Sequence, residues 1–124
     1  MPSIKHLPCF QSDLGDLTVL EGIFPGPIKR VYYIYDVPAD VVRGGHRHHV
    51  TWQILVCIRG KCRVYVHNGE VETEIWLDQP DKCLILEPRD WHSMDQFSSD
   101  ALLLVLANEV YDPRDYIDEP YPKQ

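Results

Sequence analysis

The chain has 124 residues, of which 44% are hydrophobic and 25% charged, and its formal net charge is −7. This size and composition predict a single globular domain over residues 1–124 that builds its own core. The negative charge argues against a protein that wraps nucleic-acid backbones, and no apolar run approaches the length of a membrane span. Because the first residues, with Pro2 and Pro8, lack the basic start and apolar middle of a signal peptide, we expect a cytoplasmic protein.

The first third of the chain predicts two strands separated by a break. Residues 13–17 read as a turn that leads into a short strand at residues 18–21. Phe24-Pro25-Gly26-Pro27 then interrupts regular structure, and residues 28–36 are a strongly β-forming run. The two-residue period of a strand puts Arg30, Tyr32 and Ile34 on one face of this run.

Residues 50–60 predict a strand that is apolar on both faces. A hairpin about Arg59-Gly60 would place alternate residues of two strands on one side, namely Gln53, Leu55, Cys57, Cys62, Val64 and Val66. The opposite side carries Ile54, Val56 and Ile58, so we expect a second sheet or a partner subunit to cover it. Asn68-Gly69, between two β-rich runs, predicts another hairpin.

The rest of the chain supplies further short strands, at residues 73–77, 82–86, 91–97 and 101–107, separated by polar turns. Short strands at this regular spacing predict an all-β sandwich or barrel. Beyond them Asp112 and Pro113 predict a short terminal helix, with Asp112 as its cap and Pro113 at its first position. The four cysteines form no Cys-x-x-Cys pair, and we interpret them all as buried thiols: Cys9, Cys57, Cys62 and Cys83.

Three of the six histidines can meet in one cavity. His46 and His48 are two residues apart in a predicted strand, so their side chains share a face. His92 follows a turn that contains a proline and would point inward. His49 must point away from His48, whereas the two remaining histidines, His6 and His67, are expected to be solvated at the surface.

Each of these histidines also has a structural interpretation. His46 and His48 could be a pair that is simply held by hydrogen bonds, and Trp91 with His92 could pack at the mouth of a barrel. Freed of a metal, however, imidazoles with an ordinary pKa near 6.5 are suited to proton transfer at neutral pH.

Two segments resemble the cupin motifs. Arg43-Gly44-Gly45-His46-Arg47-His48, read with Gln53 and Gly60, is similar to the first motif, and Pro88-Arg89-Asp90-Trp91-His92 is similar to the second. The resemblance implies an all-β fold of the cupin type, a small barrel also called a double-stranded β-helix or jelly roll. Metal-binding cupins usually carry a glutamate at the position of Gln53. An amide oxygen is a weak ligand compared with a carboxylate, so we expect neither a metal nor another cofactor.

A longer set of blocks resembles the WxcM-like cupins, which include the nucleotide-sugar 3,4-ketoisomerases of the FdtA and QdtA type. The blocks are residues 28–34, 43–48, 53–57, 91–92 and 104–107, Tyr111-Asp112 and Asp115-Tyr116-Ile117. The resemblance implies a homodimeric enzyme that moves the carbonyl of dTDP-4-keto-6-deoxy-D-glucose from C4 to C3 without a metal, in deoxy-aminosugar and lipopolysaccharide biosynthesis. The family's His-x-His pair carries over onto His46 and His48.

The resemblance also implies substrate-binding residues. The family's arginine before the glycine carries over onto Arg43, and its Arg-Val-Tyr-Tyr strand onto Arg30 and Tyr32. Two departures stand out: Arg47 replaces the usual alanine between the histidines, and Leu14 occupies the place of an early arginine. Strand alternation points Arg47 away from the site, whereas the missing arginine puts the family's nucleotide contacts in question.

The chemistry of such an isomerisation assigns roles to these side chains. One of His46 and His48 would take the C3 proton, and the other would move protons between the oxygens or deliver one to C4. The candidate donors to the enediolate oxygen are Arg43, Tyr32 and Gln53. Arg30 or Arg43 would bind a diphosphate, and the segment Trp91-His92 is expected to contact the substrate.

Two other interpretations remain open. One is a metal-dependent cupin enzyme that uses His46, His48 and His92 as ligands. The other is a non-catalytic module that binds a nucleotide sugar, in which Arg47 marks a degenerate site.

Overall fold

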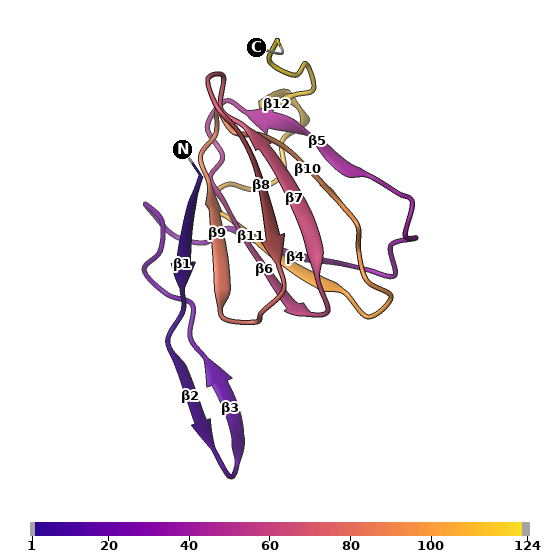
Figure 1. Cartoon of the computed structure of the whole chain (residues 1–124). Coiled ribbons are helices and arrows are strands. Elements are labelled where there is room, and N and C mark those ends of the chain that lie inside the picture. The colour runs from indigo at the N-terminus through magenta and orange to yellow at the C-terminus, as the bar shows by residue number, and fades with distance from the viewer. Residues whose placement is uncertain (1, 123–124) are drawn as a thin grey trace.

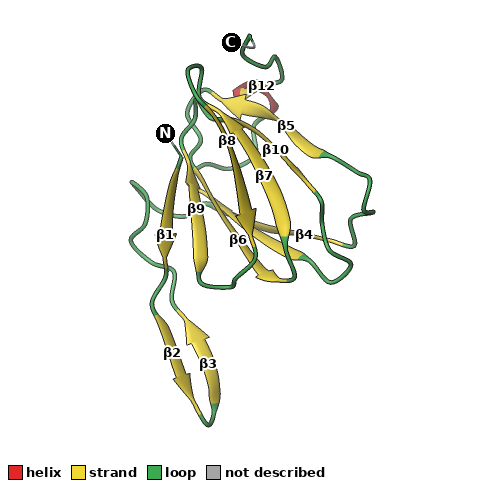
Figure 2. Ribbon diagram, in the orientation of Figure 1, coloured by secondary structure: helices red, strands yellow, loops and turns green. Residues whose placement is uncertain are grey.

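The computed structural model describes residues 2–122 and contains two five-stranded antiparallel sheets packed face to face (Figures 1 and 2). The first sheet has the order β1 (Ser3–His6), β9 (Lys82–Leu86), β6 (Gln53–Arg59), β11 (Leu102–Ala107) and β4 (Arg30–Tyr35). The second has the order β12 (Tyr116–Ile117), β5 (Arg43–His48), β10 (Trp91–Asp95), β7 (Cys62–His67) and β8 (Glu72–Leu77). The predicted all-β class and jelly-roll architecture are confirmed.

Both sheets contribute alternate residues to the core between them. Leu55 and Cys57 of β6 pack in one cluster with Cys62, Val64 and Val66 of β7. The sequence therefore placed these residues correctly on one side of their strands. The reason is the two-residue period, which turns every second side chain toward the opposite sheet.

The predicted hairpin between β6 and β7 is wrong, because the two strands belong to different sheets. The chain crosses from one sheet to the other at Gly60, where φ is 65° and an added Cβ would lie 2.3 Å from the Ser98 Oγ. Lys61, between the two strands, is held by Ser98: its N–H donates to the Ser98 Oγ at 2.9 Å, and its carbonyl oxygen accepts from the Ser98 N–H at 2.9 Å. The hairpin at Asn68-Gly69 is confirmed and joins β7 to β8.

The other face of β6 is covered by the N-terminal part of the same chain. Its Ile54 and Val56 are buried in a second cluster, against which Leu20, Ile23 and Phe24 pack. These three residues lie between β3 and β4. Within the described residues this segment, and not a second sheet, therefore covers Ile54 and Val56. Ile58, farther along the same face, is 37% exposed, and its coverage by a partner subunit stays a prediction.

Three N-terminal strands were not predicted. β1 adds to the edge of the first sheet, while β2 (Cys9–Ser12) and β3 (Gly15–Thr18) form a hairpin that projects from the body of the molecule (Figure 1). Every residue of these strands is exposed, so they carry no alternation of buried and exposed positions. The strand expected at residues 18–21 instead ends at Thr18, and Cys9 is exposed rather than buried.

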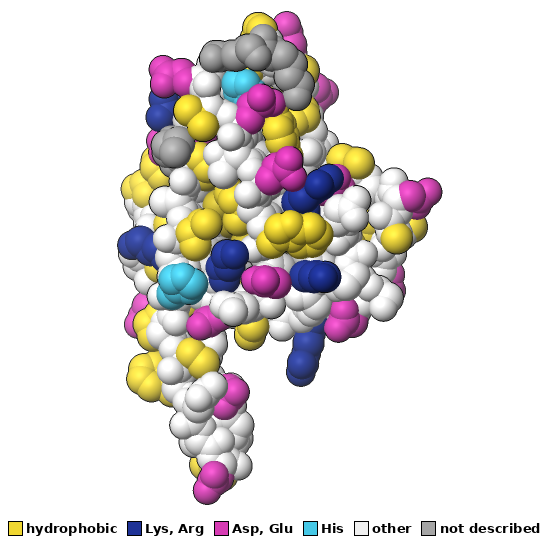
Figure 3. Space-filling view, viewed as in Figure 1, with side chains coloured by type: hydrophobic (Ala, Val, Ile, Leu, Met, Phe, Trp, Pro, Cys, Tyr) yellow, Lys and Arg dark blue, Asp and Glu magenta, His cyan; other side chains and the backbone are white. Residues whose placement is uncertain are grey.

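The remaining predictions about the fold are largely confirmed. The thiols of Cys57, Cys62 and Cys83 are buried and free. A 3₁₀ helix at Pro113–Asp115 begins at Asp112, whose side chain accepts a hydrogen bond from the Arg114 N–H at 3.0 Å. On the face drawn in Figure 3, basic and acidic side chains are interspersed with hydrophobic ones. Across residues 2–122, no helix is long and apolar enough to cross a membrane.

Candidate active site

A glycine bulge in β5 brings the predicted histidines together. His46 pairs with His92 of β10, but the next pair joins Gly44 to Ser93, so Gly45 is an extra residue. Gly44 and Gly45 have φ values of 81° and 83°, which favour glycine. A Cβ on Gly44 would lie 3.1 Å from both the carbonyl oxygen of His92 and the sulfur of Met94. The bulge thus lets β5 approach β10 closely while His46 and His48 still point into the space between the sheets.

Four rings form a compact cluster at this point. The His46 ring centroid lies 5.1 Å from that of His48 and 5.0 Å from that of His92, in edge-to-face geometry. Tyr116 of β12 completes the cluster, with its ring 4.7 Å from each of His46 and His48. Such contacts fix the planes of the two imidazoles before any substrate arrives.

Burial keeps the three imidazoles uncharged at neutral pH. His48 is 5% exposed, and its burial, followed by the neighbouring His46, lowers its pKa to about 4. Burial likewise lowers the pKa of His46, and it lowers the pKa of His92 to about 3. Neutral imidazoles carry a nitrogen lone pair that can accept a proton. The Nε2 of His48 is buried and has no hydrogen-bond partner among residues 2–122.

The tautomer of His92 follows from its environment. Its Nδ1 lies 3.0 Å from the backbone oxygen of Asp90, which can only accept, so Nδ1 carries the hydrogen and Nε2 carries the lone pair. Asp90 is itself fully buried, and its Oδ2 accepts a hydrogen bond from the Glu87 N–H at 2.7 Å. Burial raises the pKa of Asp90. The turn before β10 therefore holds His92 rigidly.

A cavity of about 180 Å³ opens beside the histidines. Its lining includes Arg30, Tyr32, Ile34, Arg43, Gly44, His46, Gln53, Leu55, His92, Met94, Val105 and Tyr116. Six of the eight residues predicted for the site are in this set, and His48 adjoins it through its ring contacts with His46 and Tyr116. Polar groups thus surround a space bounded on its other sides by the apolar core.

Arg30 organises the polar wall of the cavity. Its guanidinium carbon lies 4.3 Å from the centroid of the Tyr32 ring, and its Nη1 donates to the hydroxyl of Tyr116 at 3.2 Å. Gln53 donates through Nε2 to the hydroxyl of Tyr32 at 3.1 Å. Burial, together with the neighbouring Tyr116, raises the pKa of Tyr32 and so keeps its phenol protonated. Arg43 is exposed at the mouth.

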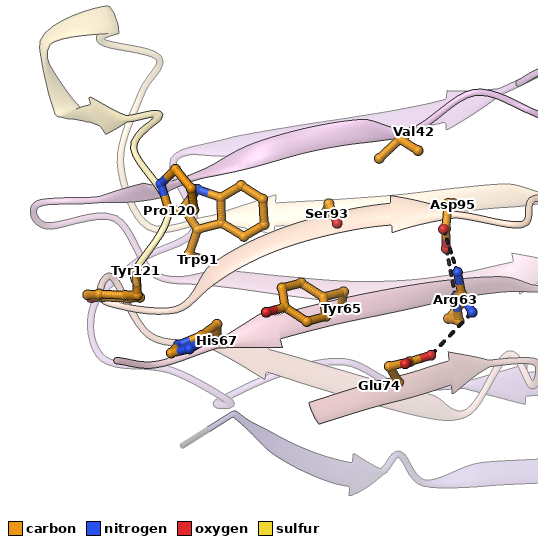
Figure 4. A pocket seen from close by; sticks show the side chains of 10 residues that line it. All are labelled: Val42, Arg63, Tyr65, His67, Glu74, Trp91, Ser93, Asp95, Pro120 and Tyr121. Atoms are coloured by element: carbon orange, nitrogen blue, oxygen red, sulfur yellow. Dashed lines mark hydrogen bonds and ion pairs between the residues drawn. The ribbon is translucent and has the colours of Figure 1, made fainter. Parts of the chain in front are cut away.

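Trp91 is not part of this site. It lines a separate surface trough on the outer face of β7 and β10, with Tyr65 and Tyr121 (Figure 4). Consecutive residues of a strand point to opposite faces, so Trp91 and His92 cannot both point inward. The outward direction of Trp91 could therefore have been predicted from the sequence, by strand alternation from His92.

His67 also departs from its expected place at the solvated surface. It is only 2% exposed. The reason is the C-terminal segment, whose Tyr121 ring lies over it with the centroids 5.4 Å apart. This contact is long-range, so the local sequence gave no sign of it. His6 and His49 are exposed as expected.

The C-terminal segment contributes to the site in a way that was not predicted from the sequence. Asp115 accepts hydrogen bonds through Oδ1 from the backbone N–H groups of His49 and Val50, at 3.0 and 2.9 Å, and through Oδ2 from Thr51. Burial opposes its ionisation, but these hydrogen bonds outweigh burial and lower the pKa of Asp115. The same clamp sets the next residue, Tyr116, opposite His48. The residues around Tyr116 in the sequence do not indicate that it lies in the site, because its position depends on how β12 pairs with β5.

The three histidines contact one another as rings. Within residues 2–122, no group of three or more His, Cys, Asp or Glu side chains is arranged so that it could hold a metal ion. What the arrangement offers is two adjacent neutral nitrogen bases beside a small cavity lined with hydrogen-bond donors. This combination suits acid–base chemistry on a compact polar substrate.

Known proteins share both the sequence and this arrangement of strands. Residues 2–122 match the family described as FdtA: WxcM-like, C-terminal. A TDP-4-oxo-6-deoxy-alpha-D-glucose-3,4-oxoisomerase of Aneurinibacillus thermoaerophilus is 47% identical over 93 residues, which are 75% of this chain and 67% of that protein.

Two solved structures are similar over almost the whole chain. One is QdtA, a sugar 3,4-ketoisomerase from Thermoanaerobacterium thermosaccharolyticum in complex with TDP, at 36% identity and a TM-score of 0.90, covering 95% of this chain and 88% of that one. The other is the WlaRB TDP-quinovose 3,4-ketoisomerase from Campylobacter jejuni, at 36% identity and a TM-score of 0.90, covering 95% and 92%. These matches confirm the resemblance seen in the sequence, and the chain belongs to the FdtA family of WxcM-like proteins.

Proposed function

We propose that this protein is a sugar-nucleotide 3,4-ketoisomerase that moves the carbonyl of dTDP-4-keto-6-deoxy-D-glucose from C4 to C3. The observation that carries the proposal is the pair of buried, uncharged imidazoles, His46 and His48, in ring contact beside a cavity of about 180 Å³. Membership of a family whose similar members are 3,4-ketoisomerases supports the same substrate class.

The reaction needs one carbon–hydrogen bond broken and one formed. A neutral imidazole of the pair takes the proton from C3, and the electrons of that bond form a C3–C4 double bond while the C4 carbonyl becomes an enediolate oxygen. A proton then passes from the C3 hydroxyl to the C4 oxygen. Protonation of C4 by an imidazolium restores a carbonyl, now at C3. Atoms and electrons balance without an external oxidant or reductant, and each positioned proton transfer contributes roughly 100-fold to 10,000-fold.

The cavity wall supplies hydrogen bonds to the oxygen that becomes negative. Tyr32, whose raised pKa keeps its hydroxyl protonated, the Gln53 amide and Arg43 are the donors. A water-poor pocket strengthens such bonds, and removing one donor typically costs about 100-fold to 1,000-fold in rate. Since Gln53 and Tyr32 already bond to each other, their positions are fixed in advance.

The cavity is large enough to enclose only part of the substrate. At about 180 Å³ it is smaller than the roughly 300 to 1,000 Å³ of pockets that enclose whole drug-sized ligands. It fits the keto sugar, so the nucleotide extends from the mouth. Arg43 is exposed there and Arg30 lines the wall, and an arginine fork pairs well with diphosphate oxygens.

We also infer that the protein acts as a homodimer. β4 lies at the edge of its sheet, and its outward side chains Val31, Tyr33 and Tyr35 are 57%, 61% and 58% exposed. The projecting β2–β3 hairpin similarly exposes Phe10 and Leu17, at 62% and 58%. Apolar surface of this kind supports contact with a second copy. Light scattering on the purified protein should give the mass of a dimer, and Tyr33→Asp should shift it toward the monomer.

The central test is to mix the protein with dTDP-4-keto-6-deoxy-D-glucose in heavy water and to follow the sugar protons by NMR. We expect the 4-keto signals to give way to those of a 3-keto sugar, with solvent deuterium entering at the exchanging carbon. Binding of the substrate without conversion would instead mean a non-catalytic binding protein. We further propose that the protein acts in the cytoplasm, in the deoxy-aminosugar biosynthesis that supplies lipopolysaccharide.

A further inference from the structure

A second concave site lies on the outside of the molecule. The trough that contains Trp91 has a volume of about 470 Å³ and shares no lining residue with the catalytic cavity (Figure 4). Two antiparallel strands make its floor, β7 and β10. Their register pairs three outward-facing couples in a row: His67 with Trp91, Tyr65 with Ser93, and Arg63 with Asp95. Successive couples are about 7 Å apart, so the row is roughly 13 to 14 Å long.

One end of the trough is aromatic and held in place by the C-terminal segment. The indole N–H of Trp91 donates to the Asp118 oxygen at 3.0 Å, and the Tyr121 hydroxyl donates to the Arg89 oxygen at 2.8 Å. The guanidinium of Arg47 lies 4.4 Å from the centroid of the Tyr121 ring. Since the polar atom of the Trp91 ring is already bonded, what this ring offers a ligand is its apolar surface. The Tyr65 ring lies at an interplanar angle of 75° to the Trp91 ring, with the two centroids 6.0 Å apart.

The other end carries a surplus of carboxylate. Arg63 binds Asp95 through Nε at 2.9 Å and Nη2 at 2.7 Å, while its Nη1 lies 3.2 Å from Glu74. All three nitrogens of the guanidinium therefore face carboxylates, and two negative charges share one positive charge. Each carboxylate oxygen keeps a lone pair that can still accept a hydrogen bond. A ligand at this end should donate hydrogen bonds and should carry no negative charge.

We propose that this trough binds an uncharged saccharide of two sugar rings. A pyranose presents C–H groups on a face, which pack against an aromatic ring, and hydroxyl groups around its rim, which donate to carboxylates and accept from Ser93. Two linked rings match the length of the row, and the volume is in the range of small-molecule sites. The surplus negative charge repels a nucleotide diphosphate, so the ligand differs in class from the substrate of the catalytic cavity.

The test is saturation-transfer NMR on the full protein with the uncharged disaccharides maltose, cellobiose and melibiose, and with TDP as the charged comparison. We expect at least one disaccharide to receive saturation on the C–H protons of one ring face. Trp91→Ala should weaken that binding about tenfold or more. Asp95→Asn is a second variant that should also weaken binding, and it provides the test if Trp91→Ala does not fold.

A matched control is available on the same sheet. Trp76 is 40% exposed on the outward face of β8 but does not line the trough, so Trp76→Ala should leave the affinity within about twofold. Circular dichroism and thermal melting establish that each variant is folded. The proposal is overturned if none of the three disaccharides binds the wild-type protein at tens of millimolar, or if Trp76→Ala and Trp91→Ala weaken binding equally.

Discussion

Gly44 lies against the backbone of His92, so close that a side chain at this position would meet the His92 carbonyl oxygen at 3.1 Å. The two residues are 48 positions apart in the chain, and the contact sets the register in which His46 comes to face His92. The geometry of the histidine cluster therefore depends on a residue that has no side chain of its own.

Gly44→Ala should destabilise the fold and strongly reduce isomerase activity. Its positive φ of 81° costs any other residue about 1 to 3 kcal/mol, and the contact with His92 adds to this cost. Gly26→Ala is the matched control, since Gly26 has a φ of 80° but no described residue has an atom within 4 Å of an added Cβ. Urea unfolding of both variants measures the difference. Equal destabilisation of the two would show that the close approach to His92 does not matter.

His46→Ala and His48→Ala should each leave the protein folded and abolish measurable isomerisation. Removing a positioned acid or base typically costs roughly 100-fold to 10,000-fold, and the two imidazoles divide the proton transfers between them. His49→Ala provides the control, because His49 adjoins the pair in sequence but its side chain is exposed. Turnover is followed by NMR. If both site variants turn over at the wild-type rate, His46 and His48 do not carry out the proton transfers.

Exhaustive chelation should leave the activity of the wild-type protein unchanged. Gln53 replaces the carboxylate that a metal-binding cupin usually supplies, and its amide is bonded to the Tyr32 hydroxyl at 3.1 Å. The experiment is dialysis against a strong chelator, followed by elemental analysis and an activity assay. Loss of activity that a single added metal restores would favour a site made by His46, His48 and His92.

The stability of the protein should fall as the pH drops below about 6.5. The unfolded chain binds protons at its histidines near pH 6.5, whereas the folded protein resists protonation until about pH 4 at His48 and about pH 3 at His92. Between these values the unfolded state holds more protons, so acid favours unfolding, and above pH 6.5 these groups have no effect. The combined loss should be a few kcal/mol by pH 4.

His92→Gln tests this origin directly. Glutamine cannot titrate in this range, so the variant should lose less stability between pH 7 and pH 4.5 than the wild-type protein does, whatever its stability at pH 7. Urea midpoints at the two pH values give the comparison. If the variant and the wild-type protein lose the same stability between the two pH values, groups other than His92 dominate the acid response.

Tyr116→Phe and Tyr116→Leu should separate two roles of this side chain. The phenylalanine variant keeps the ring contacts with His46 and His48 but loses the hydrogen bond from Arg30, so we expect mainly a higher KM. The leucine variant loses the ring that fixes both imidazoles, so kcat should fall and its pH profile should shift. If both variants keep the wild-type kcat and pH profile, the ring does not position the histidines.

Much of the fold followed from local pattern. The two-residue period placed His46 with His48 and Arg30 with Tyr32, and it selected the inward residues of β6 and β7. Asn68-Gly69 and Asp112-Pro113 specified a hairpin and a helix start through the chemistry of two or three neighbouring residues. These features could be predicted because strand alternation, turn geometry and capping each depend on short stretches of chain.

The sequence by itself determined which side chains share a strand face and which chemistry they can perform. Only the tertiary structure decided that β6 and β7 lie in opposite sheets, that Tyr116 completes the ring cluster, and that Tyr121 buries His67 while Trp91 faces outward. The physical reason is that sheet membership and ring packing arise from contacts between distant segments. Their free energies belong to the assembled core and not to any local run of residues.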